Sequence, residues 1–60
     1  MTVVEQRLVK NYAILVMGNV MQLAEVSDQA VTLADNSAST LRKQVEIEVA
    51  KREIEILQQL

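Results

Sequence analysis

The chain has 60 residues, a formal net charge of −2, and neither cysteine nor histidine. A chain of this size buries only about 60% of its unfolded surface, so small domains are usually stabilised by disulfides, a metal or a partner subunit. The missing residue types exclude disulfides and nearly all transition-metal sites, which leaves oligomerisation as the expected stabiliser. Half of the residues are hydrophobic, yet only Tyr12 is aromatic, so we expect a folded protein with an aliphatic core.

The charge pattern does not favour nucleic-acid binding. Six basic and eight acidic residues form no basic cluster, and stacking aromatic residues are lacking. The uncharged run 12–17 is far shorter than the about 20 apolar residues that span a bilayer. Arg7 and Lys10 precede this run as in a signal peptide, but Glu5 interrupts the basic region and no Ala-x-Ala cleavage site follows. The sequence therefore favours a cytoplasmic protein that does not bind membranes.

The first part of the chain is predicted to be a helix from about Val3 to about Val26. Thr2 is a suitable N-cap, and Glu5 stands three residues later, as in a capping box. The apolar positions form one broad face of this helix. Gly18 fits either a tolerated helix glycine or a close helix crossing or kink.

Residues 27–40 are predicted to be a short hairpin, with an irregular polar loop as the alternative. Polar and apolar residues alternate over 29–33 as in a strand, and 34–37 (Ala-Asp-Asn-Ser) has the composition of a turn. Residues 38–40 then form the return strand. Two strands alone are barely stable in water, so the hairpin must lie on the helices or on another subunit.

Residues 41–60 are predicted to be a second helix, capped by Ser39 or Thr40. Parts of this segment alternate as strands do, but no turn residue separates those parts, and the helix is favoured. Three pairs of opposite charge are spaced i,i+4, namely Arg42–Glu46, Glu48–Arg52 and Lys51–Glu55. Apolar residues form two stripes on this helix, one with Val45, Val49, Ile56 and Leu60 and the other with Ile47, Ala50, Ile54 and Leu57.

A helix with two apolar stripes usually packs between two partners. We therefore expect a single, mainly α domain, an antiparallel helix pair with a short β-hairpin or loop between the helices, completed by oligomerisation. A symmetric homodimer is favoured over a tetramer. The predicted oligomer interface consists of Val45, Ile47, Val49, Ile54, Ile56, Leu57 and Leu60.

No residue pattern points to an enzyme or to a cofactor. The usual general bases and soft metal ligands are lacking. The carboxylates of Glu46, Glu48, Glu53 and Glu55 stand in i,i+2 pairs, which diverge on a helix and indicate a solvated surface. The acidic residues of the central segment do not match an EF-hand loop.

The central segment is the predicted partner surface, since the polar strips of the helices are narrow. It holds acidic and small polar residues, contains no basic residue, and offers backbone groups that could pair with another strand. The alternative is a connector whose polar residues only shape turns. The residues concerned are Asp28, Thr32, Asp35, Asn36 and Ser37.

Three stretches of the sequence carry a family resemblance: 11–16 (Asn-Tyr-Ala-Ile-Leu-Val), 23–26 (Leu-Ala-Glu-Val) and 41–46 (Leu-Arg-Lys-Gln-Val-Glu). They resemble a group of very small proteins encoded in phages and prophages of low-GC Gram-positive bacteria, often near tail or lysis genes. The chain departs from those proteins at Val26-Ser27, where they often have Val-Pro, and in its longer middle segment. The resemblance implies a phage-associated protein and transfers no catalytic residue.

Taken with the composition, these patterns predict a small, non-catalytic oligomeric structural or interaction protein, and the resemblance implies that it is phage- or prophage-associated. The expected partner is a second copy of the chain, and another phage or host protein is the further candidate. The alternative is a small transcriptional regulator or an acidic decoy of a nucleic-acid-binding protein.

Overall fold

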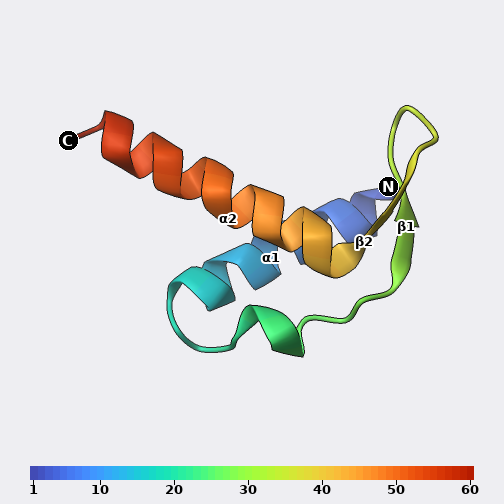
Figure 1. Cartoon of the computed structure of the whole chain (residues 1–60), viewed down its shortest axis with the longest axis horizontal. Helices are drawn as coiled ribbons and strands as arrows, with labels where there is room; N and C mark the ends of the chain where they lie inside the picture. Colours follow the sequence, from blue (N-terminus) through green and yellow to red (C-terminus); the bar gives the residue numbers. More distant parts are fainter.

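The computed structural model describes the whole chain, residues 1–60, and shows a mainly helical fold (Figure 1). Two helices pack against each other, and a short antiparallel two-stranded sheet lies between them in the sequence. The predicted mainly α class with a hairpin between two helices is confirmed. The elements are α1 (Val3–Met17), the 3-10 turn η1 (Leu23–Glu25), β1 (Ala30–Thr32), β2 (Ala38–Thr40) and α2 (Leu41–Gln58).

The start of α1 is fixed by the predicted capping box. The Thr2 hydroxyl accepts a hydrogen bond from the Glu5 backbone N–H at 3.1 Å, and the Glu5 carboxylate accepts one from the Thr2 backbone N–H at 2.8 Å. These two bonds satisfy backbone donors that the first helical turn otherwise leaves free. The carboxylate also lies at the positive end of the helix dipole.

The end of α1 differs from the prediction, because the helix stops at Met17 and not near Val26. Gly18 is the C-cap, and Asn19 takes the left-handed conformation with φ 59°. The backbone N–H groups of Asn19 and Val20 bond back to the last turn, to the carbonyls of Val16 and Leu15. This pattern is a Schellman motif, which terminates a helix. Gly18 is therefore neither a tolerated interior glycine nor a helix-crossing point.

The hairpin forms where the sequence predicted it. Val31 of β1 lies opposite Ser39 of β2, and the strands are joined by a turn in which Leu33 N–H bonds to Ser37 C=O at 2.9 Å. Asn36 supplies the left-handed residue of this turn, with φ 67°. The N–H of Leu41 bonds to the Gln29 carbonyl at 2.9 Å, so α2 follows the sheet without a linker.

The two helices are not the antiparallel pair expected from the sequence. Both begin beside the hairpin and cross each other, as Figure 1 shows. Two contacts explain this arrangement. Thr32 of β1 accepts a hydrogen bond from the Met1 amine next to the start of α1, and β2 continues directly into α2. The long connection after α1 thus returns the chain to the end at which α1 began.

The core is small and aliphatic, as expected, and only 6 of the 60 residues are buried. Tyr12, Val16, Met21, Leu23 and Val49 are among the half-buried side chains that surround it. The accessible surface is 4453 Å², whereas about 3,900 Å² is expected for a folded monomer of this mass. The excess surface indicates that part of the chain projects from the packed body. The buried residues are Val9, Ala13, Val26, Val31, Leu41 and Val45.

Candidate functional site

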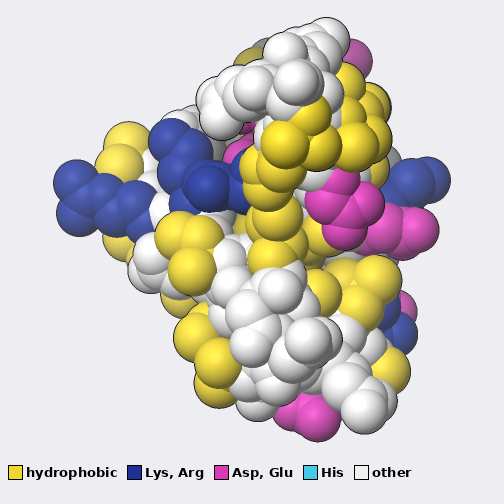
Figure 2. Space-filling view, turned by 90° about the vertical axis from the view of Figure 1, so that its left-hand side faces the viewer, with side chains coloured by type: hydrophobic (Ala, Val, Ile, Leu, Met, Phe, Trp, Pro, Cys, Tyr) yellow, Lys and Arg dark blue, Asp and Glu magenta, His cyan; other side chains and the backbone are white.

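The projecting part is the second half of α2, which extends well beyond α1 (Figure 1). Its large aliphatic side chains are open to solvent: Ile54 is 55% exposed, Leu57 66% and Leu60 96%. Figure 2 looks at the end of the molecule from which α2 projects, and hydrophobic side chains lie there among both basic and acidic ones. Scattered apolar residues are normal on a monomer, but a helix face lined by several of them is typical of an interaction surface.

The structure divides the predicted interface residues between the interior and the surface. Val45 is fully buried inside the chain and packs in the core, so its assignment to an oligomer interface was wrong. Val49 is half-buried against the same core. The apolar stripe of α2 that contains Val45 and Val49 is therefore covered in part by the core of the same chain. The residues that remain exposed are Ile47, Ile54, Ile56, Leu57 and Leu60.

Charged groups flank the exposed face, and few of them are paired. Of the three predicted i,i+4 pairs only Glu48–Arg52 forms, with 2.8 Å between the Arg52 Nε and the Glu48 carboxylate. Glu46, Lys51 and Glu53 are exposed and make no salt bridge within the chain. Their charges are therefore free to face a partner.

The acidic turn of the central segment is occupied by its own hydrogen bonds. The Asp35 carboxylate accepts bonds from the Ser37 hydroxyl at 2.6 Å and from the Ser37 backbone N–H at 3.1 Å. These bonds, the hydroxyl bond first, hold the pKa of Asp35 below its ordinary value. With Asn36 in the left-handed conformation, all three residues have a role in shaping the turn.

The proposed partner surface is thus exposed, but its residues are not gathered into one site. Asp28, Thr32 and the turn residues Asp35–Ser37 are all on the surface. Only Thr32 lines a hollow, whereas Asp28 and the turn do not. For the turn, the geometry favours the alternative interpretation, in which the polar residues only determine the backbone conformation.

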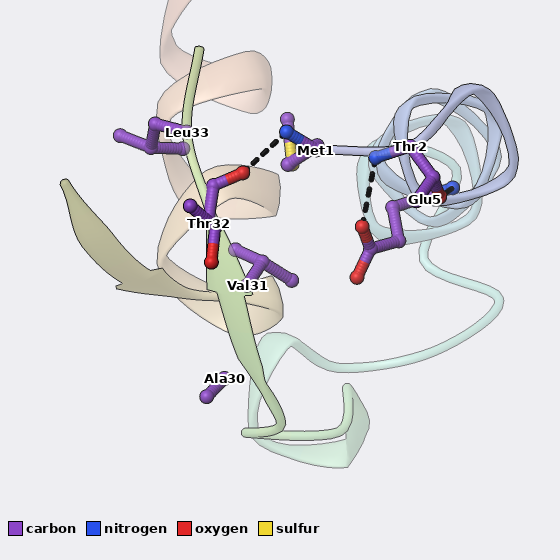
Figure 3. Close-up of a pocket in the computed structure, with 7 residues that line it drawn as sticks. All are labelled: Met1, Thr2, Glu5, Ala30, Val31, Thr32 and Leu33. Carbon is purple, nitrogen blue, oxygen red and sulfur yellow. Dashed lines mark hydrogen bonds between the residues drawn. The ribbon is translucent and has the colours of Figure 1, made fainter. Parts of the chain in front are cut away.

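A shallow hollow of about 380 Å³ lies between β1 and the start of α1 (Figure 3). No local pattern indicates it, because the two walls, Met1 and Thr32, are 31 residues apart in the chain. Its carboxylate, that of Glu5, is engaged by the Thr2 N–H and serves as a helix cap. The other lining residues are Ala30, Val31 and Leu33.

No cluster of three or more His, Cys, Asp or Glu side chains is arranged to hold a metal ion. A second hollow of about 160 Å³ lies between the helices, where Lys10 and Glu48 are the charged lining residues. Neither helix combines the length and the apolar character that a bilayer crossing needs.

Comparisons with protein-family models, with curated proteins and with solved structures return no match for this chain.

Proposed function

We propose that this protein is a small, non-catalytic interaction protein that self-associates through the exposed apolar residues of α2. The observation that carries the proposal is the projecting half of α2, on which Ile54, Ile56 and Leu57 remain at least half exposed. The small core supports it as well, since a chain with 6 buried residues gains much from a second hydrophobic contact.

The experiment is sedimentation of the purified chain over a range of concentrations. We expect at least twice the chain mass at micromolar concentration for the natural sequence, and the monomer mass for Ile54→Glu, because the dimer would bury its carboxylate. Val4→Glu is the matched control, since Val4 is 67% exposed and lies on α1. Circular dichroism should show helix in both variants. A chain that stays monomeric and melts at one temperature at every concentration contradicts the proposal.

We further propose that the assembly belongs to a phage or prophage, as the resemblance of residues 11–16, 23–26 and 41–46 implies. Adjacent tail, holin or lysin genes would support this placement. Salt-dependent retention of DNA in a mobility-shift assay would instead favour a regulator. Because the net charge is −2, we expect the chain not to retain DNA in that assay.

A further inference from the structure

The outer face of α2 carries a seam with the spacing of a coiled coil. Its apolar members are separated by three, four and three residues, which is the alternation of a and d positions in a heptad. At 3.6 residues per turn, the seam lies about 180° from the face of Leu41 and Val45, which is buried in the core. The body of the protein therefore leaves most of the seam open to solvent, although Ile47, 52% exposed, also lines the hollow between α1 and α2. We define the outer seam as Ile47 (a), Ala50 (d), Ile54 (a) and Leu57 (d).

We propose that two copies of this chain pair through their outer seams as a parallel, in-register, two-stranded coiled coil. The inference rests on the self-association proposed above and adds its geometry. β-branched residues at a with leucine at d favour two strands in parallel coiled coils, and Ile47, Ile54 and Leu57 match this preference. Lys43, one heptad before Ala50, ends the seam toward the hairpin.

The charged residues beside the seam favour the parallel orientation. In a parallel pair, each g residue faces the e residue that stands five positions later on the other helix. Glu46 then faces Lys51 of the partner subunit, and symmetry repeats this contact. Glu53 faces Gln58 of the partner subunit in the same way. Glu46 and Lys51 have no salt bridge within their own chain, so both are available.

The antiparallel orientation brings like charges together. If Ile47 packs opposite Leu57 of the partner subunit, the e positions meet each other and the g positions meet each other. Lys51 then faces the partner's Lys51, and Glu53 faces the partner's Glu53. Like charges opposite each other are destabilising, so the same apolar layers favour the parallel pair.

The seam is only two heptads long, which is short for an independent coiled coil. An isolated helix of that length is marginal because its first turn is costly to form. In this chain α2 is already helical, and its first half is held by α1, η1 and the hairpin. The pair therefore forms between ordered helices, and the cost of ordering them is not part of association.

Cysteine cross-linking tests the orientation, because the chain has no cysteine of its own. In the parallel pair, Ile47→Cys and Leu57→Cys each form a disulfide with the same position of the second copy, where the Cα atoms come within reach. In the antiparallel pair, only a mixture of the two variants is cross-linked. Glu55→Cys, off the seam, is the control for random collision.

A charge reversal tests the register. Glu46→Lys replaces two attractive contacts by two repulsive ones, and we expect the dissociation constant to rise about tenfold. Adding Lys51→Glu should restore the affinity. Glu55→Lys is the matched control for Glu46→Lys, because both glutamates have basic residues three and four positions before them in the sequence. Since Glu55 lies off the seam, this variant should leave the affinity nearly unchanged.

The outcomes separate the two proposals. Sedimentation of a dimer together with self-cross-linking at positions 47 and 57 supports the parallel pair. A dimer that is cross-linked only between Ile47→Cys and Leu57→Cys overturns the parallel orientation and leaves self-association intact. A monomer at every concentration overturns both proposals.

Discussion

The guanidinium of Arg42, in the first turn of α2, donates a hydrogen bond from Nε to the backbone carbonyl of Val26, sixteen residues earlier, at 3.1 Å. A second bond, from its Nη2 to the Ala24 carbonyl, measures 3.2 Å. These two contacts join the end of η1 to the start of α2 and hold the connection between α1 and the hairpin. Val26 is buried beside them, so the polar contacts cover part of the core.

Arg42→Ala should lower the free energy of unfolding by about 1–2 kcal/mol, because hydrogen bonds to a charged group are among the stronger ones. Urea unfolding followed by circular dichroism measures this change. The neighbouring Lys43 is exposed and serves as the control: Lys43→Ala should change the free energy by less than about 0.5 kcal/mol. Equal effects of the two substitutions would show that the Arg42 contacts do not stabilise the fold.

Glycine and alanine variants of Asn19 should rank in stability in the opposite order from the same variants of an asparagine within a helix. Its φ of 59° is strained for alanine and free for glycine, so Asn19→Gly should be about 1 kcal/mol more stable than Asn19→Ala. Asn11 is exposed within α1, where alanine should be about 1 kcal/mol better than glycine. Urea unfolding of the four variants provides the comparison. The same order at both positions would contradict the Schellman geometry at Asn19.

The sequence was informative wherever the structure is determined by neighbouring residues. Thr2 and Glu5 form the predicted capping box, and the turn around Asp35 and Asn36 lies where its composition indicated. The start of α2 at Leu41 follows from the cap by Thr40, whose hydroxyl accepts a bond from the Lys43 N–H. In each case the hydrogen-bonding partners lie within a few residues of one another.

The end of α1 was missed although a local signal was present. Gly18 followed by Asn19 is a recognisable helix stop, since both residues tolerate the conformations of a C-terminal cap. Leu23 lies on the apolar face that the helical spacing predicts, and this spacing favours the longer helix. In the structure Leu23 is half-buried against the core although it lies outside α1, so its burial does not require that the helix continue.

The crossing of the helices and the role of Arg42 could not be derived from local patterns. The i,i+4 spacing predicted that Arg42 pairs with Glu46, but its guanidinium bonds to two carbonyls that are distant in sequence. The second apolar stripe of α2 was predicted to be covered by a partner. The structure shows that it is uncovered within one chain, and what covers it remains a proposal.

The pKa of Asp35 should rise toward its ordinary value when the Ser37 hydroxyl is removed. That hydroxyl is the largest cause of the lowered pKa, so Ser37→Ala should raise the pKa while the backbone bond keeps it partly lowered. Titration of the Asp35 carboxyl by NMR measures the effect. Ser27→Ala, at an exposed position outside the turn, should leave this pKa unchanged.

The hydrogen bonds from Ser37 to Asp35 also make the stability of the hairpin depend on pH. Because the pKa of Asp35 is lower in the folded chain than its ordinary value of 3.8, the stabilisation is fully present well above that value. It is lost as the pH falls through the folded pKa, since the protonated carboxyl no longer holds the two Ser37 donors. We expect Ser37→Ala to flatten this part of the stability curve. An unchanged acid dependence would contradict the role of the turn.

Leu41 should be the least replaceable side chain of the molecule. It is 1% exposed and lies at the junction of β2 and α2, where its N–H bonds to the Gln29 carbonyl. A buried Leu→Ala substitution costs about 2–5 kcal/mol, and a domain of this length has only about 3–9 kcal/mol of stability in total. Leu41→Ala should therefore remove about half of the stability and lower the melting temperature strongly, whereas Leu41→Met, which conserves volume, should cost less than about 1.5 kcal/mol.

Leu57→Ala is the counterpart of Leu41→Ala on the exposed part of the same helix. Because Leu57 is 66% exposed in the single chain, its loss should leave the melting temperature of the dilute protein nearly unchanged. At high concentration the same variant should melt below the natural sequence, since the dimer buries Leu57 and stabilises the fold by mass action. Thermal melts of both alanine variants at two concentrations measure these effects. A Leu57→Ala chain that is unfolded when dilute would show that α2 does not project freely, and the seam would then belong to the core.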